Sequence, residues 1–258
     1  MQNKLTSDKT LLALLAPENQ LKIHLLDTVD STNSEAKRYC LSGGELPALF
    51  IARGQTGGRG RLGRSFDSSY GKGLYMTLAL KPKSGATPHS LTLTAGCATL
   101  LAIRELTGAE PEIKWVNDIE IQNKKVSGIL AEGAFDMDGN MSYAIVGIGV
   151  NIRKRDFPPE LAERAGTLEE LTGYAPDEAV LAANIANRFF SLSQDFSSAL
   201  AVYRERLNTL GRRILVRGVN TEYTAKAIDI DEEGNLIIML DDGSYDKLFF
   251  GEISVINQ

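Results

Sequence analysis

Four strand-like segments follow one another between residues 112 and 150, and no other pattern in the chain limits the possible folds as much. They cover residues 112–115, 119–121, 126–135 and 141–150. Their connections are too short for a helical crossover, and two are turn sequences, Gln122-Asn123 and Asp138-Gly139-Asn140. Strands joined by such turns pair in an antiparallel way. We therefore predict an α+β chain with a mixed, largely antiparallel sheet rather than a doubly wound parallel one.

Further strands and helices are expected on either side of this region. Strand patterns cover residues 21–26, 48–53 and 73–80. A helix is expected to begin at Thr32, because Glu35 stands three residues later and completes the pattern of a capping box. A long helix is expected over residues 88–106, and residues 160–209 read as helices, with 179–196 the clearest amphipathic stretch. The sheet should therefore be flanked by helices.

The chain changes character at Gly211, after which short strand patterns alternate with turns. The strand patterns cover residues 213–216, 221–229, 235–240, 245–249 and 253–256. So many short strands in so few residues predict a small C-terminal β-barrel of the SH3-like kind. We expect two domains, residues 1–210 and residues 211–258.

Composition excludes several classes of protein. The chain has 28 Lys and Arg against 33 Asp and Glu, a formal charge of −5, which argues against a general nucleic-acid binder. Its two cysteines, Cys40 and Cys97, lack the spacings of a zinc site or a redox pair, so we expect two reduced thiols. The N-terminal apolar run, residues 11–16, is too short for a signal peptide, and no run approaches the roughly 20 residues of a membrane span. We expect a cytoplasmic protein without a membrane partner.

Residues 53–64, RGQTGGRGRLGR, form a segment that we name the Gly/Arg loop. It holds five glycines and four arginines, and no acidic residue lies between Glu45 and Asp67, so the local charge is +4. Glycines let backbone N–H groups approach a ligand, and guanidinium groups give charge-assisted hydrogen bonds to carboxylate or phosphate oxygens. We therefore expect an anion to bind here, and we expect the loop to be mobile until an anion orders it.

Two phosphate-binding motifs match the Gly/Arg loop by coincidence. Residues 58–63 fit G-x-G-x-x-G, and residues 58–65 resemble a Walker A loop with Arg64 in place of the lysine. Both motifs need a helix directly after the loop, because the helix N-terminus holds the phosphate. Residues 66–72 are polar and turn-rich, and the next expected element is a strand. We therefore predict neither a dinucleotide-binding fold nor a P-loop.

Four further blocks accompany the Gly/Arg loop. They are Asp30-Ser31-Thr32-Asn33, Lys114-Trp115-Val116-Asn117-Asp118, Lys124-Lys125-Val126-Ser127-Gly128-Ile129-Leu130 and Gly147-Ile148-Gly149-Val150-Asn151. In this order and spacing, the blocks and the loop resemble the biotin protein ligases, whose cousins are the lipoate ligases. The resemblance runs from about residue 21 to the end of the chain. It implies a class II synthetase-like catalytic fold that binds biotin and ATP in residues 1–210.

The resemblance implies a two-step reaction. Biotin and ATP are expected to give biotinyl-5′-AMP and pyrophosphate, and the biotinyl group then passes to one lysine of the biotin carboxyl carrier domain of a biotin-dependent carboxylase. Attack of a carboxylate on the α-phosphate brings two anions together, and their repulsion at 4 Å is about 1 kcal/mol in water and about 4 kcal/mol at an effective dielectric of 20. Cations must offset this repulsion. Mg²⁺ is also implied, held mainly by the ATP phosphates with few ligands from the protein, and no metal-binding residue is assigned.

The resemblance also assigns residues to these steps. Lys125 matches the family's catalytic lysine, which can bridge the biotin carboxylate and the α-phosphate, and Arg61 shares the catalytic role. Biotin is expected to contact Ser31, Thr32, Asn33, Gln55, Arg59, Gly60, Arg61, Lys125, Gly147 and Gly149. ATP is expected to contact Arg64, Phe66, Lys114, Asn117 and Asn151. Without the family, residues 31–33 could simply cap a helix, and Asn117 could form a turn.

The chain departs from the family pattern at several positions. Val116 stands where proline is usual, and Phe66 stands where tryptophan is common, so adenine stacking should be weaker. Residues 251–254, GEIS, match the family's C-terminal motif, yet Ile256 stands where some members carry an arginine directed at phosphate. Whether the C-terminal domain contacts ATP therefore stays open.

Some family members also repress transcription through an N-terminal DNA-binding domain. Only 29 residues precede Asp30, too few for a helix-turn-helix, so we expect a monofunctional ligase without a DNA partner. One alternative is a lipoate ligase-like acyl transferase, which should lack the run at 58–61. Another is a non-catalytic biotin-binding protein, which would have no use for Lys125 or Arg61. A sheet edge could pair with a second copy, giving a homodimer, or with the acceptor.

Overall fold

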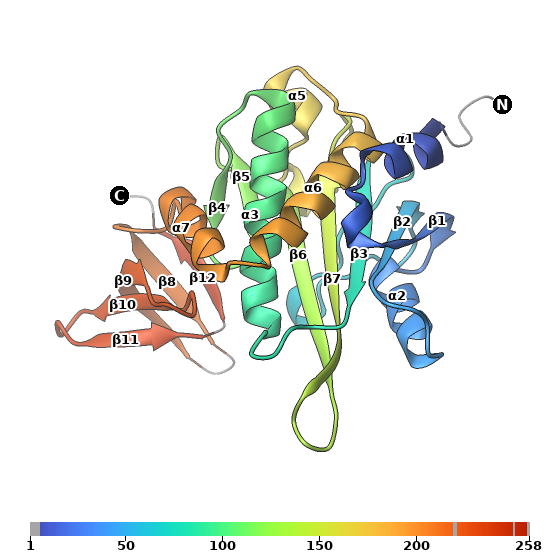
Figure 1. The fold of residues 1–258 in the computed structure, drawn as a ribbon. Helices are drawn as coiled ribbons and strands as arrows, with labels where there is room; N and C mark the ends of the chain where they lie inside the picture. The colour runs from blue at the N-terminus through green and yellow to red at the C-terminus, as the bar shows by residue number, and fades with distance from the viewer. Residues whose placement is uncertain (1–5, 219–220, 250, 257–258) are drawn as a thin grey trace.

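The computed structural model describes residues 6–218, 221–249 and 251–256 (Figure 1). A seven-stranded sheet lies at the centre, and a five-stranded sheet lies beside it. The strands of the large sheet are β1 (Lys22–Val29), β2 (Ala48–Gln55), β3 (Gly73–Leu80), β4 (Glu112–Lys114), β5 (Asp118–Ile121), β6 (Lys124–Phe135) and β7 (Met141–Asn151). The helices are α1 (Thr6–Leu14), α2 (Thr32–Leu41), α3 (Pro88–Thr107), α4 (Pro159–Ala162), α5 (Leu168–Thr172), α6 (Glu178–Leu192) and α7 (Phe196–Arg206), with short 3₁₀ turns η1 (Pro17–Asn19) and η2 (Arg61–Gly63).

The large sheet has the strand order β1-β2-β3-β7-β6-β5-β4. β1 runs parallel to β2, and every other neighbouring pair is antiparallel. Gln122 and Asn123, with φ of 51° and 60°, turn the chain between β5 and β6, and Gly139, with φ of 81°, lies at the tip of the β6–β7 hairpin. This hairpin extends beyond the rest of the sheet (Figure 1). The predicted α+β fold with a mixed, largely antiparallel sheet is confirmed.

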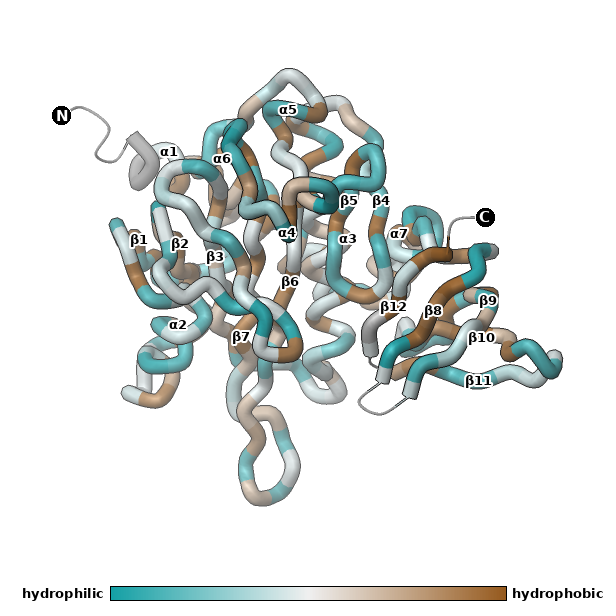
Figure 2. Tube along the Cα trace, turned by 180° about the vertical axis from the view of Figure 1, so that it is seen from behind, coloured by the Kyte–Doolittle hydropathy of each residue, from teal (hydrophilic) through white to brown (hydrophobic). Residues whose placement is uncertain are grey.

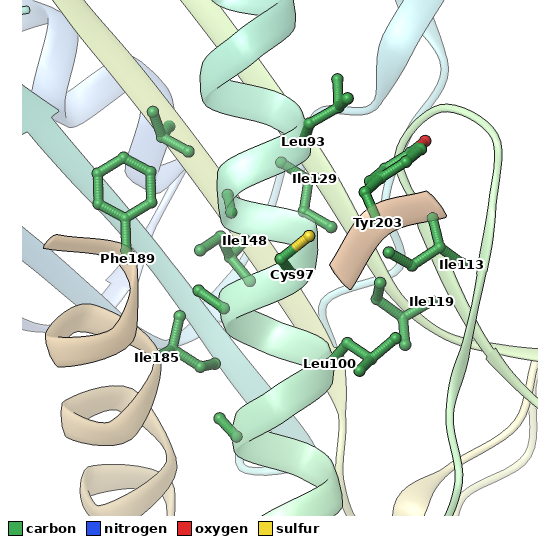
Figure 3. Close-up of a cluster of buried hydrophobic side chains, with 14 of the residues drawn as sticks. Leu93, Cys97, Leu100, Ile113, Ile119, Ile129, Ile148, Ile185, Phe189 and Tyr203 are labelled. Carbon is green, nitrogen blue, oxygen red and sulfur yellow. The ribbon is translucent and has the colours of Figure 1, made fainter. Parts of the chain in front are cut away.

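Helix α3 lies at the centre of the hydrophobic core (Figure 3). Its residues Leu93, Cys97 and Leu100 are fully buried, and Phe189 of α6 and Tyr203 of α7 lie on either side of it. Burial of each of these Leu and Phe side chains contributes roughly 1.5–3 kcal/mol to stability. Burial also raises the pKa of the Cys97 thiol to about 12. The thiol therefore stays protonated and unreactive at neutral pH.

Helix α2 covers the other face of the large sheet, where Ala36 packs against Ile145 of β7. Successive residues of a strand point to opposite faces of its sheet. The apolar residues at even positions from 144 to 150 belong to the core under α3. Gly147 and Gly149 therefore lie on the α2 face, and their missing side chains leave that face hollow beside α2.

The capping box expected at Thr32 and Glu35 is wrong. Ser31 is the N-cap residue of α2, with φ of −157°. The Thr32 hydroxyl donates to Gln55 Oε1 at 3.1 Å, and the Glu35 carboxylate accepts from Arg38 at 2.9 Å. The Thr32 hydroxyl, which a capping box would use, is therefore bonded to a side chain of strand β2.

The amphipathic helix expected over residues 179–196 is α6, which ends earlier than expected. α6 ends at Leu192, and α7 begins at Phe196 after Asp195, whose carboxylate accepts from the Ser197 N–H at 3.1 Å. The break at residues 193–195 is polar, but Leu192, Phe196 and Leu200 keep a spacing of four residues across it, so hydrophobic spacing alone does not reveal the break. Within the described part of the chain, no helix combines the length and apolar character that a membrane crossing requires.

The C-terminal sheet contains five antiparallel strands. They are β8 (Arg213–Arg217), β9 (Glu222–Ile230), β10 (Leu236–Leu240), β11 (Tyr245–Leu248) and β12 (Glu252–Val255). Their order β11-β10-β9-β8-β12 places β11 and β12 at opposite edges, and no pairing joins these edges among the described residues. The described strands form an open sheet and not the closed SH3-like barrel that was expected. Apolar and polar residues alternate in the same way in an open sheet and in a barrel, so this pattern does not distinguish the two. The division into residues 1–210 and 211–258 stays a prediction.

Candidate active site

A cavity of about 710 Å³ opens on the α2 face of the large sheet. Its walls come from the start of α2, the Gly/Arg loop, strands β5 to β7, the segment around α4, and the C-terminal sheet. The predicted site residues that line it are Ser31, Thr32, Asn33, Gln55, Arg59, Gly60, Arg61, Arg64, Phe66, Lys114, Asn117, Lys125, Gly147 and Gly149. Its volume suits a small organic ligand. The structure thus brings together all the predicted residues except Asn151.

The charge of the cavity wall is opposite to that of the whole chain. Seven cationic residues line it, against three acidic ones. The cationic residues are Arg59, Arg61, Arg64, Lys114, Lys125, Arg164 and Arg217, and the acidic ones are Asp118, Glu120 and Glu160. An anionic ligand is therefore favoured here, although the net charge of the protein is −5.

One end of the cavity is a network of amides and hydroxyls, which we name the amide end. Gln55 Oε1 accepts from the Thr32 N–H at 2.7 Å, and Gln55 Nε2 donates to Ser68 Oγ at 2.7 Å. Thr77 donates from its hydroxyl to Asn33 Oδ1 at 2.8 Å. Thr32, Asn33, Ser68 and Thr77 are all buried. The network holds polar groups in fixed orientations, which suits a ligand with a compact polar head.

Glu132 belongs to the amide end and was missed by the sequence reasoning. Its carboxylate accepts from Asn33 Nδ2 at 3.0 Å and from both terminal nitrogens of Arg59 at 3.0 and 3.2 Å. Glu132 pairs with Ile145 in the β6–β7 register, which places it on the α2 face. An acidic residue inside the small and apolar run of β6 was the signal that could have found it. The bidentate pair holds Arg59 over this end of the cavity.

Gly147 and Gly149 are required by close neighbours. A Cβ at Gly147 would lie 2.1 Å from Asn33 Oδ1, and a Cβ at Gly149 would lie 2.5 Å from the Phe66 ring. Phe66 also contacts Tyr75 edge-to-face, with ring centroids 6.4 Å apart. The resemblance assigned Phe66 to ATP, and the structure places its ring on the glycine strand assigned to biotin. The Phe66 ring therefore forms part of the cavity floor, next to Gly149 of β7.

Two lysines of the cavity pair with acidic residues of β5. Lys125 Nζ lies 2.6 Å from Asp118 Oδ1, and Lys114 Nζ lies 3.4 Å from Glu120 Oε1. The side chains of Lys125 and Asp118 are 33% and 24% exposed, so the pair is open to a ligand. The sequence predicts no role in the site for Asp118 or Glu120. They hold both ammonium groups in place inside the cavity.

The segment after α4 fixes the backbone of Lys125. The Lys125 N–H donates to the Arg164 carbonyl at 2.7 Å, and the Gly166 N–H donates to the Lys125 carbonyl at 3.0 Å. Lys124 Nζ donates to the carbonyls of Ala162 and Glu163 at the end of α4. Cations are favourable at helix C-termini. The two adjacent lysines therefore differ in their surroundings: Lys124 contacts the end of α4, and Lys125 lines the cavity.

Arg61 connects three parts of the wall. Its Nη1 donates to Asn117 Oδ1 at 3.0 Å, and its Nη2 donates to the Gly251 carbonyl at 2.8 Å. Asn117 in turn donates from Nδ2 to the Ile129 carbonyl at 2.9 Å. The C-terminal sheet contributes Arg217 and residues 251, 253 and 254 to the cavity. The C-terminal sheet is therefore part of the site wall.

Asn151 does not line the cavity. Its Oδ1 accepts from Arg155 Nη2 at 2.9 Å, and Arg155 Nη1 donates to Asp67 Oδ1 at 2.9 Å and to Ser69 Oγ at 2.7 Å. The Arg155 side chain is only 5% exposed and lies over the Phe157 ring. In the sequence, Arg155 looks like one of three solvated basic residues at 153–155. Asn151 therefore supports Arg155 in this structure, and its expected ATP contact stays a prediction.

The Gly/Arg loop folds as a tight hairpin. The Gly60 N–H donates to the Arg64 carbonyl at 2.7 Å, and the Phe66 N–H donates to the Gly58 carbonyl at 2.9 Å. Gly58 must be small, since its Cβ would lie 2.4 Å from the Phe66 carbonyl oxygen. The next regular element is strand β3, not a helix. The rejection of the dinucleotide and P-loop motifs is confirmed.

No cluster of three metal-ligating side chains occurs among the described residues. Both carboxylates of β5 that face the cavity are paired with lysines. Mg²⁺ prefers oxygen ligands, keeps several waters, and often binds through substrate phosphates with one or two carboxylates. The residues present fit a Mg²⁺ ion that arrives with a nucleotide, with Asp118 as the nearest carboxylate to the central lysine.

Comparison with known proteins shows the family of the chain. The model of the biotin/lipoate A/B protein ligase family matches residues 25–151, and that of the biotin protein ligase C terminal domain matches residues 209–255. The bifunctional ligase/repressor BirA of Bacillus subtilis is 32% identical over 243 residues, which cover 90% of this chain and 74% of that protein. The biotin–acetyl-CoA-carboxylase ligase of Paracoccus denitrificans is 32% identical over 83% of this chain and 92% of its own length.

Solved structures give the same answer. The biotin protein ligase from Aquifex aeolicus in complex with biotin and ATP superposes with a TM-score of 0.77 at 30% identity, covering 92% of this chain and 99% of that one. The family matches span the large sheet, the Gly/Arg loop and the C-terminal sheet together. The chain therefore belongs to the biotin protein ligase family.

Proposed function

We propose that this protein activates biotin with ATP as biotinyl-5′-AMP and transfers the biotinyl group to a lysine of the biotin carboxyl carrier domain of a biotin-dependent carboxylase. One observation carries the proposal. A single cavity joins a buried amide and hydroxyl network to a cationic centre at Lys125 and Arg61. The amide end suits the ureido group of biotin, and the cationic centre suits the carboxylate and phosphates that must react.

In the first step, a biotin carboxylate oxygen attacks the α-phosphorus of ATP. The new C(O)O–P bond forms as the bond to the β-phosphate oxygen breaks, and pyrophosphate leaves. Lys125 offsets the negative charge at the meeting point, and Arg61 adds a guanidinium that spans Asn117 and Gly251. Asp118 holds the Lys125 ammonium until the ligand anions compete for it.

In the second step, the amine of the acceptor lysine attacks the carbonyl carbon of biotinyl-5′-AMP. An amide forms, AMP leaves with the bonding electrons, and the attacking nitrogen loses a proton. Lys125 and Arg61 again face the phosphate charge that grows on the leaving group. The Gly/Arg loop covers the cavity and keeps water from the mixed anhydride. When bound, Mg²⁺ would neutralise phosphate charge as a Lewis acid, held chiefly by the phosphate oxygens.

The proposal is tested by following labelled biotin into a purified carrier domain. Transfer should require ATP, this protein and the acceptor lysine, and a carrier with that lysine changed to arginine should stay unlabelled. Lipoate offered in place of biotin should give no product, because it lacks the ureido group that the amide end accommodates. Failure to label the intact carrier, or labelling with lipoate instead, would contradict the proposal.

A further inference from the structure

Glu132 of β6 connects the amide end to the Gly/Arg loop. Its Oε2 accepts from Asn33 Nδ2 at 3.0 Å, and its carboxylate oxygens accept from the Arg59 guanidinium at 3.0 and 3.2 Å. The side chains of Glu132 and Arg59 are 31% and 44% exposed, whereas Asn33 is only 4% exposed. The contact with Asn33 is therefore the more buried one, and a hydrogen bond to a carboxylate is strengthened where water is excluded.

The side-chain amide of Asn33 is oriented by two acceptors. Nδ2 donates one hydrogen to Glu132 Oε2 and the other to the Leu130 carbonyl at 3.3 Å. An amide nitrogen has two N–H donors, so both are used within the protein. If the amide were turned over, its oxygen would face a carboxylate oxygen and a carbonyl oxygen with no hydrogen between them. Glu132 opposes that orientation most strongly, because hydrogen bonds to charged groups are the stronger ones.

The amide oxygen of Asn33 is left as an acceptor on the cavity side. Oδ1 accepts from the Thr77 hydroxyl at 2.8 Å, and a carbonyl oxygen has two lone pairs. A Cβ at Gly147 would lie 2.1 Å from this oxygen, which therefore projects into the space that the glycine leaves open. Helix α2, which carries Asn33, lies beside β7, which carries Gly147 (Figure 2). Both residues line the cavity, so the second lone pair faces the ligand space.

A ligand that uses this lone pair must offer a hydrogen-bond donor. The ureido group of biotin offers two N–H groups, whereas the dithiolane ring of lipoate offers none. A buried acceptor that stays unpaired is costly, so the same oxygen favours the first ligand and disfavours the second. The orientation of the Asn33 amide therefore bears on which ligand this end of the cavity accepts.

We propose that Glu132 is a positioning residue for biotin recognition, because it holds the Asn33 amide with its oxygen towards the ligand. The inference rests on the proposed function and deepens it, since it names a residue that selects the ureido group without touching it. Glu132 does not itself line the cavity. Its ion pair with Arg59 is a separate contact, which holds the loop and does not orient Asn33.

Two substitutions of Glu132 separate these contacts. Glu132→Leu fills a similar volume and offers no acceptor to Asn33 or to Arg59. Glu132→Gln still offers an amide oxygen to Asn33 Nδ2, but it removes the negative charge that pairs with Arg59. Asp241→Ala is the matched control, since Asp241 also accepts from one arginine and one uncharged side chain, Arg213 at 2.8 Å and Thr224 at 2.9 Å, and does not line the cavity.

The experiment measures biotin-dependent exchange between ATP and pyrophosphate for wild type and these three variants. Glu132→Leu should raise the KM for biotin about ten- to a hundredfold, the loss expected for a hydrogen bond to a charged group. Its KM for ATP should stay at the wild-type value, which also shows that the variant is folded. Glu132→Gln should bring the KM for biotin back close to that of wild type, and Asp241→Ala should match wild type in both constants.

The outcomes separate the two proposals. If wild type shows no biotin-dependent exchange, the proposed function fails, and the role of Glu132 fails with it. If wild type exchanges and Glu132→Leu keeps the wild-type KM for biotin, the role of Glu132 is overturned while the function stands. A KM for biotin as high in Glu132→Gln as in Glu132→Leu would overturn it as well, because the ion pair with Arg59 would then be the contact that matters. Equal rises in the KM values for biotin and ATP would indicate a general loss of structure and would also contradict the proposal.

Discussion

The Arg61 guanidinium donates to the Gly251 carbonyl at 2.8 Å and so joins the Gly/Arg loop to the C-terminal sheet. The same side chain reaches Asn117 at the start of β5. Because one residue touches the loop, the large sheet and the small sheet, closure of the loop and the position of the C-terminal sheet are coupled through it. The cavity is complete only with all three parts in place.

Lys125→Ala should abolish adenylate formation and retain measurable biotin binding. Loss of a charge that faces the reacting oxygens should lower the exchange rate about a hundredfold or more. The amide end, which lies away from Lys125, should still hold biotin. Calorimetry with biotin and the exchange assay measure the two properties separately, and exposed Lys226→Ala on β9 serves as the control. Normal turnover by Lys125→Ala would show that its assigned role is wrong.

Gly149→Ala should displace Phe66, because the added methyl group would lie 2.5 Å from its ring. We expect the KM for biotin to rise about tenfold, since a clash of this kind costs roughly 1–3 kcal/mol. Phe66→Ala in the same chain should relieve the clash and restore part of the loss. Gly96→Ala in α3 is the control, as its methyl group meets nothing within 4 Å. Equal KM values for Gly149→Ala and wild type would contradict the account of the cavity floor.

Arg155→Met should destabilise the protein by about 2–3 kcal/mol, because it leaves the partly buried Asp67 carboxylate without its guanidinium. Asp67→Asn should lower this penalty, so the double variant should lose less than the sum of the two single variants. Urea unfolding of the four proteins measures the coupling. Strict additivity would mean that the pair does not fix residues 67–69 beneath the Gly/Arg loop.

Trypsin should cleave the Gly/Arg loop readily in the free protein and much more slowly with biotin and ATP present. The loop is exposed at Leu62, whose φ is 54°. Bound anions should hold its arginines in place. Cleavage after the exposed Lys83 should be equal in both conditions. Equal rates at the loop with and without ligands would refute the expectation that anions order it.

The sheet could be predicted from the sequence because the pairing of its strands depends on short turns between neighbouring segments. The turns at 122–123 and 138–140 bring neighbouring strands together, and the residue types at these positions require such turns. The anion-binding role of the Gly/Arg loop could also be predicted, because four arginines without a nearby acidic residue indicate an anionic ligand. Lys125 was identified through the family resemblance, and its place in the cavity agrees with that assignment.

Contacts between distant segments could not be predicted in the same way. Gln55, on the neighbouring strand β2, accepts a hydrogen bond from the Thr32 hydroxyl, so the capping box that the local pattern indicates does not form. Arg155 donates a hydrogen bond to Asn151, and the basic run at residues 153–155 gives no sign that Arg155 is buried. The open C-terminal sheet has the same alternation as a barrel, since closure depends on how the edge strands meet.

The most direct measurement is isotope exchange between ATP and pyrophosphate with the purified protein. The account predicts rapid exchange that depends on biotin, disappears in Lys125→Ala and is not supported by lipoate. Exchange with lipoate in place of biotin, or no biotin-dependent exchange at all, would contradict it.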